Sequence, residues 1–219
     1  MLTITLKQGK EKPVLAGQRW IYASAIERVD GRPNEKMSAG ITAVVQSSST
    51  QFLGRAAYNS RSQIRARIWS VDPAEAVDHA MIKRRVQAAV AKYAVKHAVK
   101  HAVEHAVEHA TKPARSIALV EGEEAGLSGL SVEWHGGRTG FLICAFHAAG
   151  VDAWKVPIVQ ALIAATGCPN VYECCDPLLR KGEGLPVLSG VLAGEEPPEE
   201  FRLAPGERQV RAKGKAPRS

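Results

Sequence analysis

The first seventy residues consist of short runs of β-forming residues, without the pattern of a long helix. Isoleucine, valine and aromatic residues concentrate in residues 20–22, 41–46, 52–58 and 62–70. Clusters rich in Asp, Gly, Pro, Asn and Ser lie between these runs and are typical of turns. Several short strands at this spacing predict a small β-barrel or sandwich, because such strands bury a face only when the sheet closes or stacks.

A different pattern begins at Asp72-Pro73 and predicts a helix. Aspartate is a preferred N-cap, and proline is favoured at the first helical position. The helical pattern continues to Ala110 or Thr111 and stops before Pro113, which cannot extend it. Beyond this proline the sequence is typical of a mixed α/β unit, with a helix over residues 151–166 and strands over 117–121, 130–134, 139–146, 171–174 and 185–191.

These patterns predict an α+β protein in four segments. We expect a barrel domain over residues 1–72, a helical linker over 73–112, a central α/β domain over 113–195 and a basic tail over 196–219. From Glu195 onward the chain is rich in charged residues, Pro and Gly and poor in apolar residues, which predicts disorder.

Charge is distributed unevenly over these segments. The net charge is +6 over residues 1–72, +4 over 73–115, −8 over 116–200 and +5 over 201–219, which gives +7 for the whole chain. A basic unit beside an acidic one indicates a module that binds a polyanion, joined to a unit with another task. A chance distribution of solvated charge is the alternative.

A four-residue histidine repeat lies inside the predicted helix. His97, His101, His105 and His109 are spaced so that adjacent pairs share a helix face and could hold a metal ion. The repeat also contains H-x-x-E-H twice, the pattern of an inverted zinc peptidase. A perfect repeat generates that pattern without any selection for zinc, however, so we favour an inert helix extension and predict no metal ligand.

Several classes of protein are not expected. The apolar runs 141–150 and 156–167 are too short to span a membrane, and the N-terminus lacks the apolar segment of a signal peptide. The four cysteines show no C-x-x-C spacing and are interpreted as small buried residues. We therefore expect a reduced, cytoplasmic protein without a membrane partner.

Four motifs follow one another between residues 6 and 200. After Leu6-Lys7-x-Gly9, they are Arg19-Trp20-Ile21-Tyr22-x-x-Ala25-Ile26, Gly54-x-Ala56-x-Tyr58-Asn59-x-x-Ser62-x-Ile64-x-x-Arg67, Gly122-Glu123-x-x-Gly126-Leu127-x-Gly129-Leu130 and Asp176-x-x-x-Arg180-x-x-Glu183-Gly184-Leu185. In this order they resemble the large-subunit (23S) ribosomal RNA cytosine-C5 methyltransferase family. The third motif departs from that family, which usually has Asp at the position of Ala125 and Pro at that of Ser128.

The resemblance implies an N-terminal PUA domain and a central α/β domain. The family continues into a Rossmann-like domain that binds S-adenosylmethionine and carries a nucleophilic cysteine, but the resemblance stops near Glu200. No Gly-rich strand-to-helix turn and no DPP-type segment with a cysteine is found, and Cys144, Cys168, Cys174 and Cys175 do not align with the catalytic cysteines. We therefore expect the Rossmann-like catalytic domain to be absent, with no catalytic residue and no cofactor site in this chain.

What the resemblance leaves is RNA binding, since Lys and Arg contacts to phosphates supply most of the affinity of such modules. The candidates are Lys7, Lys10, Lys12, Arg19, Arg55, Tyr58, Arg61, Arg65 and Arg67. Strand alternation places Arg65 and Arg67 side by side on an exposed face together with Trp69. The rings of Tyr58 and Trp69 either stack on an unpaired base or belong to the core.

The function expected is that of the RNA-binding N-terminal part of an S-adenosylmethionine-dependent rRNA methyltransferase-like protein, which positions ribosomal RNA. The chain is then either truncated or acts with a separate catalytic chain or as a homodimer. A stand-alone PUA RNA-binding protein without a role in methylation is one alternative. An H-x-x-E-H zinc peptidase is a remote one.

Overall fold

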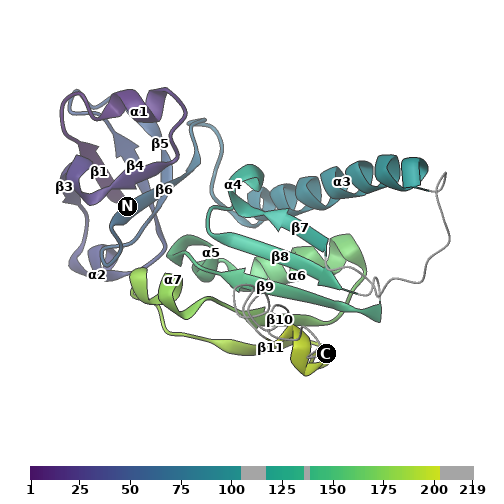
Figure 1. Cartoon of the computed structure of the whole chain (residues 1–219). Coiled ribbons are helices and arrows are strands. Elements are labelled where there is room, and N and C mark those ends of the chain that lie inside the picture. The colour runs from purple at the N-terminus through teal and green to yellow at the C-terminus, as the bar shows by residue number, and fades with distance from the viewer. Residues whose placement is uncertain (105–116, 136–138, 203–219) are drawn as a thin grey trace, which may run out of the picture.

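The computed structural model describes residues 1–104, 117–135 and 139–202, and these form two units side by side (Figure 1). The N-terminal unit is a curled sheet in the order β2-β6-β5-β4-β1-β3, in which only β1 and β4 are parallel. Its strands are β1 Leu2–Leu6, β2 Trp20–Tyr22, β3 Ile26–Asp30, β4 Ile41–Gln46, β5 Phe52–Tyr58 and β6 Ile64–Ser70. The short helices α1 Glu11–Leu15, η1 Ala23–Ala25 and α2 Pro33–Met37 connect them.

The C-terminal unit is a second sheet with two helices on one face. Its strand order is β11-β10-β9-β8-β7, and β9 and β10 are parallel because a helical crossover joins them. The strands are β7 Ile117–Glu121, β8 Leu130–His135, β9 Phe141–Phe146, β10 Val171–Cys174 and β11 Ser189–Ala193. The helices are α3 His79–Glu104, α4 Gly122–Ala125, α5 Ala149–Ala153, α6 Lys155–Thr166, α7 Pro177–Gly182 and η3 Glu199–Phe201.

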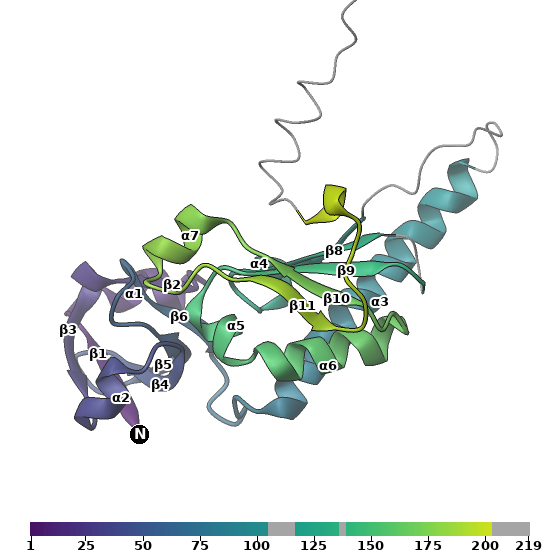
Figure 2. The same ribbon diagram turned by 90° about the horizontal axis from the view of Figure 1, so that it is seen from below.

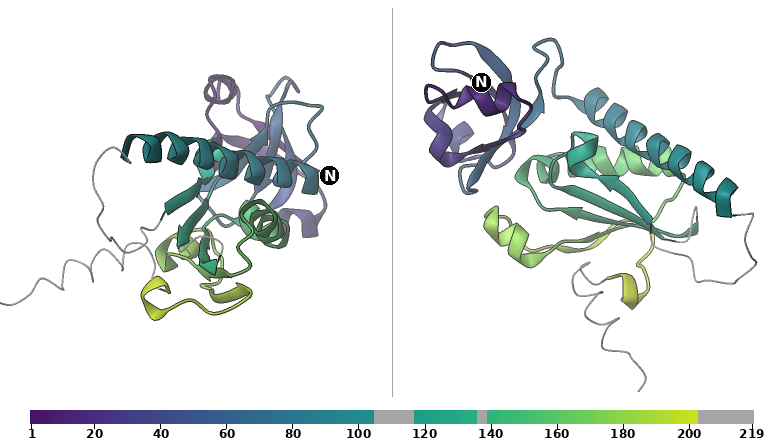
Figure 3. Two further views of the ribbon diagram at one scale, coloured as in Figure 1. Left: turned by 90° about the vertical axis from the view of Figure 1, so that its right-hand side faces the viewer. Right: turned by 45° about the horizontal axis from the view of Figure 1, so that its top comes forward.

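The two longest helices, α3 and α6, pack together on one face of the second sheet (Figure 2). Met81, Ile82 and Val86 of α3 are buried there against the sheet, in the same cluster as Ile158 and Leu162 of α6. Two further views show α3 running the length of this sheet and beyond it (Figure 3). The start of the segment expected as a linker therefore contributes to the core of the C-terminal unit.

The predicted strands are confirmed in most cases. β2, β4, β5, β7 and β10 have the predicted bounds, while β1 and β3 were missed. The helix predicted over 151–166 is interrupted at Trp154, because Pro157 lacks the N–H that would bind the Ala153 carbonyl in a continuous helix. The last strand begins only at Ser189, since the Arg180 side chain binds the Pro186 carbonyl and holds the preceding residues against α7.

The predicted start of the long helix is wrong. Asp72 accepts a hydrogen bond from the Ala74 N–H, but the chain makes only a turn there, and α3 begins at His79. Arg55 accounts for the delay, because its guanidinium binds the carbonyls of Pro73 and Glu75 at 3.1 Å each. The predicted end of the helix, with His105 and His109, lies outside the described residues.

Two expectations about protein class can be compared with the structure. All four cysteines are free and buried, which confirms their interpretation as small interior residues. Within residues 1–104, 117–135 and 139–202, no helix combines the length and the apolar character needed to cross a membrane.

The true helix start predicts which aspartate stabilises α3. Asp78 Oδ1 accepts a hydrogen bond from the Met81 N–H at 2.8 Å, as an N-cap does. Asp78→Ala is expected to lower the free energy of unfolding by about 1 kcal/mol, measured by urea denaturation. Asp72→Ala, the matched control, removes a bond within a turn and should cost less, so equal losses would contradict this assignment.

Candidate nucleic-acid interface

Four of the candidate cations form an exposed group on the N-terminal unit, which we call the basic cluster. Lys7 follows β1, Lys10 and Lys12 flank the start of α1, and Arg19 precedes β2. All four are exposed, and none has an ion-pair partner among the residues that the structure describes. Exposed, unpaired cations within one short sequence segment, residues 7–19, suit a polyanion such as a nucleic-acid backbone.

The other arginines serve partly structural roles. Arg55 holds the connection to α3, as described above, and lies 6.0 Å from the centre of the Phe52 ring. Arg61 is exposed and donates a hydrogen bond from Nη1 to the Gly184 carbonyl of the C-terminal unit at 3.2 Å. Arg65 is partly exposed, with no ion pair in the described part of the chain.

Arg67 does not lie on an exposed face, contrary to expectation. The alternation along β6 is as predicted, but the outer face of this strand packs against the C-terminal unit. The Arg67 side chain is only 15% exposed, and its Nη2 lies 2.9 Å from Glu183 Oε1. Its Nη1 donates to Ser128 Oγ at 3.2 Å, so both terminal nitrogens of this guanidinium bind groups within the protein.

The two aromatic candidates are also interior residues. Tyr58 is 7% exposed and packs in the core of the N-terminal unit, while Trp69 is 3% exposed and belongs to the core cluster of the C-terminal unit. Neither ring has an open face for a base. The core interpretation of both residues therefore describes the structure, and stacking on these two rings does not.

A buried carboxylate that was not among the predicted sites joins the two units. Glu183 accepts hydrogen bonds from Ser62 Oγ at 2.8 Å, Arg67 Nη2 at 2.9 Å, Asn59 Nδ2 at 3.1 Å and the Ala149 N–H at 3.4 Å. Asn59 Nδ2 also donates to the Glu183 carbonyl at 2.8 Å. Three of these donors come from the N-terminal unit, so the carboxylate and its partners fasten one unit to the other.

A second polar cluster extends this interface. Trp20 Nε1 lies 3.1 Å from Glu123 Oε2 and 3.3 Å from Ser128 Oγ, and the Ser128 hydroxyl donates to Glu123 Oε1 at 2.6 Å. The Arg67 guanidinium lies 5.7 Å from the Trp20 ring and connects this cluster to Glu183. Ser128, a departure from the family motif, thus supplies a hydroxyl that binds side chains of the other unit.

All four sequence motifs meet at this interface. Trp20 comes from the first motif, Asn59, Ser62 and Arg67 from the second, Glu123 from the third and Glu183 from the fourth. The bonded residues lie up to 124 positions apart, so no local pattern identifies their partners. The signal in the sequence is that each of the four motifs contains polar residues and that the motifs follow one another in the same order as in the family.

The loop that carries Glu183 is itself held in place from inside the protein. Arg180 is fully buried and donates hydrogen bonds to the Phe146 carbonyl and to Asp152 Oδ1, both at 2.6 Å. Gly184 has φ +66°, and a Cβ there would lie 2.7 Å from the Cδ of Arg61. A buried arginine and an obligatory glycine therefore fix the position of the carboxylate between them.

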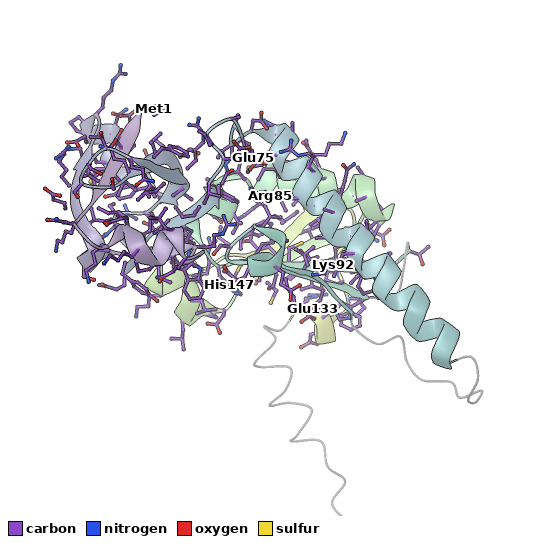
Figure 4. All side chains as sticks on the ribbon, turned by 90° about the horizontal axis from the view of Figure 1, so that it is seen from above. Met1, Glu75, Arg85, Lys92, Glu133 and His147 are labelled. Atoms are coloured by element: carbon purple, nitrogen blue, oxygen red, sulfur yellow. The ribbon has the colours of Figure 1, made fainter. Side chains whose placement is uncertain are left out.

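A cleft of about 400 Å³ lies beside the interface, between the end of β6, the connection to α3 and α4. Arg85 in its wall binds Glu75 Oε2 at 3.1 Å and the Gly126 carbonyl at 2.7 Å (Figure 4). A smaller cavity of about 210 Å³ lies between α3 and β7, where Lys92 pairs with Glu124 at 2.7 Å. The first cleft is lined by two arginines, Arg19 and Arg85, and by four carboxylates, and the charges around the second cancel, so neither cavity is suited to an anion.

The cysteine and histidine residues offer little chemistry in the described structure. Burial raises the pKa of the Cys144 thiol, and it raises that of Cys175 to about 12, so neither is a thiolate at neutral pH. Among the described residues no three His, Cys, Asp or Glu side chains gather as metal ligands would. His105 and His109 lie outside that part of the chain, so the metal-binding hypothesis stays untested.

Comparison with known proteins is consistent with this geometry. Residues 4–71 match the family model described as "PUA-like domain". These residues form a PUA-like domain. Over 198 residues the chain is 31% identical to Ribosomal RNA large subunit methyltransferase I of Aliivibrio fischeri, an alignment that covers 90% of this chain and 45% of that protein. The chain is therefore homologous to an rRNA methyltransferase and spans less than half of its length.

Solved structures show the same fold. A protein from Streptococcus mutans described as a SAM-dependent methyltransferase superimposes with a TM-score of 0.64 and 14% identity, over 91% of this chain and 45% of that one. A methyltransferase-like protein solved in complex with SAH gives a TM-score of 0.63 and 15% identity, over 91% and 44%. Together these comparisons confirm the predicted PUA-like domain and the likeness to rRNA methyltransferases.

The interface predicts a large effect of removing its central carboxylate. Glu183→Ala leaves Arg67, Asn59 and Ser62 without their shared acceptor, and it should lower the free energy of unfolding by about 3 kcal/mol. Urea denaturation measures this loss. Asp30→Ala, which removes the exposed pair with Arg28 at 2.8 Å, should change it by less than about 1 kcal/mol. Similar losses in both variants would show that Glu183 does not join the units.

His147 predicts a dependence of stability on pH. Its Nε2 accepts a hydrogen bond from the Asp176 N–H at 3.1 Å, which only the neutral ring can do. Burial lowers the pKa of His147, the Asp176 carboxylate partly offsets this, and Arg180 adds to it. The unfolded chain, with a histidine pKa of about 6.5, therefore takes up a proton first as the pH falls. Stability from this contact is complete above that pH and is lost below it.

Thermal unfolding of wild type and His147→Gln tests this direction. The wild-type Tm should fall more between about pH 7.5 and pH 5.5 than the Tm of the variant, whose amide does not titrate. The comparison cancels the protonation of all other groups. An equal fall in both proteins would show that His147 does not titrate in this range.

Proposed function

We propose that this chain is the RNA-binding part of an S-adenosylmethionine-dependent ribosomal RNA (cytosine-C5) methyltransferase-like protein, acting in the cytoplasm. The observation that carries the proposal is the basic cluster, four exposed cations on a PUA-like domain without ion pairs among the described residues. The Aliivibrio fischeri relative is a ribosomal RNA large subunit methyltransferase, which supports ribosomal RNA as the substrate.

The geometry suggests how such a chain positions RNA. Lys7, Lys10, Lys12 and Arg19 bind phosphates, which gives affinity without base specificity. The contacts of Glu183 and Trp20 hold the PUA-like domain against the C-terminal unit. RNA bound at the cluster is thereby held at a fixed distance from that unit, and positioning is the task we assign to the chain.

S-adenosylmethionine does not fit the described residues. In open α/β sheets, nucleosides bind beyond the carboxyl ends of parallel strands. Here the chain after β9 packs too closely, because a Cβ on Gly129 would lie 2.4 Å from the Ala148 Cβ and one on Gly40 would lie 2.2 Å from the Ala149 carbonyl oxygen. We therefore place the cofactor in a catalytic part outside the described residues, which belongs either to a longer form of this chain or to a separate catalytic chain.

Binding of rRNA fragments at two salt concentrations tests the proposal. The triple variant Lys7→Ala, Lys10→Ala, Lys12→Ala should weaken binding and reduce the slope of log K against log[salt] by up to about 3, since each phosphate contact contributes about one unit. Fluorescence anisotropy between about 50 and 200 mM salt measures both effects.

A matched variant removes three charges from the same domain elsewhere. Arg28→Ala, Arg32→Ala, Lys36→Ala lie in and between β3 and α2, outside the basic cluster, and Arg28 already pairs with Asp30, so this variant should leave the slope close to that of wild type. Affinity that does not depend on salt, or equal losses in both triple variants, would refute the proposal. If the chain binds rRNA but does not increase methylation by a catalytic chain, a stand-alone RNA-binding protein is favoured.

A further inference from the structure

The outer face of the β2–β6 ladder carries two aromatic residues opposite two arginines. Ile21 of β2 and Ala66 of β6 are buried in the core of the PUA-like domain, so their neighbours point to the other side. Those neighbours are Trp20 and Tyr22 on β2 and, on β6, Arg65 and Arg67.

The first aromatic–arginine pair is closed to ligands. Trp20 lies opposite Arg67 in the ladder, and the guanidinium sits 5.7 Å from the ring centre. Ser128 and Glu183 of the C-terminal unit bind Trp20 Nε1 and the two terminal nitrogens of Arg67. The pair shows that this ladder brings an aromatic ring and a guanidinium into cation–π distance.

The second pair, one step along the ladder, is open. Tyr22 is 44% exposed and has no hydrogen-bond or ion-pair partner among the residues described. A β-bulge lies here, since Ile21 pairs with Ala66 but Tyr22 pairs with Ile64, which leaves Arg65 as the extra residue of β6 opposite Tyr22. Bulges redirect side chains, and this one leaves Arg65, which has no ion pair among the described residues, opposite Tyr22 across the ladder.

We propose that Tyr22 and Arg65 form a subsite for one unpaired nucleotide of the bound RNA. The tyrosine ring stacks on the base, and the arginine binds the adjoining phosphate. This inference rests on the proposed function and deepens it, because it requires an unpaired base as well as a phosphate backbone. A lone exposed aromatic is common on protein surfaces. The combination of ring, bulge and unpaired guanidinium is what singles out this one.

The chemistry around Tyr22 favours RNA as its ligand. The turn between β5 and β6 lies next to the backbone that follows Tyr22, since the Ala23 N–H donates to the Gln63 carbonyl at 3.0 Å, and this turn carries the exposed Arg61. The segments next to Tyr22 therefore carry two arginines, Arg61 and Arg65. An aromatic surface within a basic surround suits a ligand that has both a flat base and a negative charge.

A hairpin RNA with one unpaired 2-aminopurine tests the subsite against a fully paired duplex of equal length. Wild type should bind the hairpin more tightly and quench the 2-aminopurine fluorescence by stacking. Tyr22→Ala should weaken hairpin binding roughly tenfold and abolish the quenching, while duplex binding stays unchanged. Tyr22→Phe keeps the ring and should behave as wild type, and Arg65→Ala should weaken hairpin binding more than duplex binding.

Met37→Ala is the control for loss of an exposed apolar side chain, because Met37 is 65% exposed on α2 at the other edge of the sheet. If Tyr22→Ala binds the hairpin as tightly as wild type does and quenches the 2-aminopurine fluorescence equally, the subsite is overturned. The proposed function would stay intact. Loss of duplex binding in Tyr22→Ala would overturn it as well, since stacking would then not be the cause. Failure of wild type to bind either RNA would overturn the proposed function and the subsite together.

Discussion

The hydrogen bonds to the buried Glu183 carboxylate hold the two units of this protein in one arrangement. Each donor costs free energy when it leaves water, and that cost is offset only if all of them reach the same two oxygens. The loop that carries Glu183 is accordingly fixed by Arg180 beneath it and Gly184 beside it. A rigid relation between the PUA-like domain and the second sheet follows from this one site.

The same interface decides which basic residues remain exposed. By covering the outer face of β6 it engages Arg67, and by extending to β2 it engages Trp20. The residues of the basic cluster and Arg65 remain without ion pairs in the described structure. One charged sequence segment therefore supplies both the arginine of the interface and the cations to which we assign RNA binding, and a count of arginines does not separate them.

Local patterns predicted the strands of both sheets well where branched and aromatic residues alternate between turn signals. They missed β3, whose residues are polar on the exposed side, and β1, which lies at the chain terminus. They also misplaced the start of α3, since Asp72-Pro73 satisfies the local rules for a cap. Arg55 binds the carbonyls that follow, and a side chain 18 or more residues away is not visible to a local rule.

The sequence by itself determined the α+β class, most strand positions, the basic character of the first domain and the likeness to rRNA methyltransferases, because each depends on local periodicity, composition or motif order. The tertiary structure alone decided that Tyr58 and Trp69 are interior residues, that Arg67 pairs with Glu183, and that Tyr22 is the aromatic left exposed. The physical reason is that strand alternation assigns a side chain to a face. Which faces are covered depends on the other unit, whose contacting residues lie as far as 124 positions away.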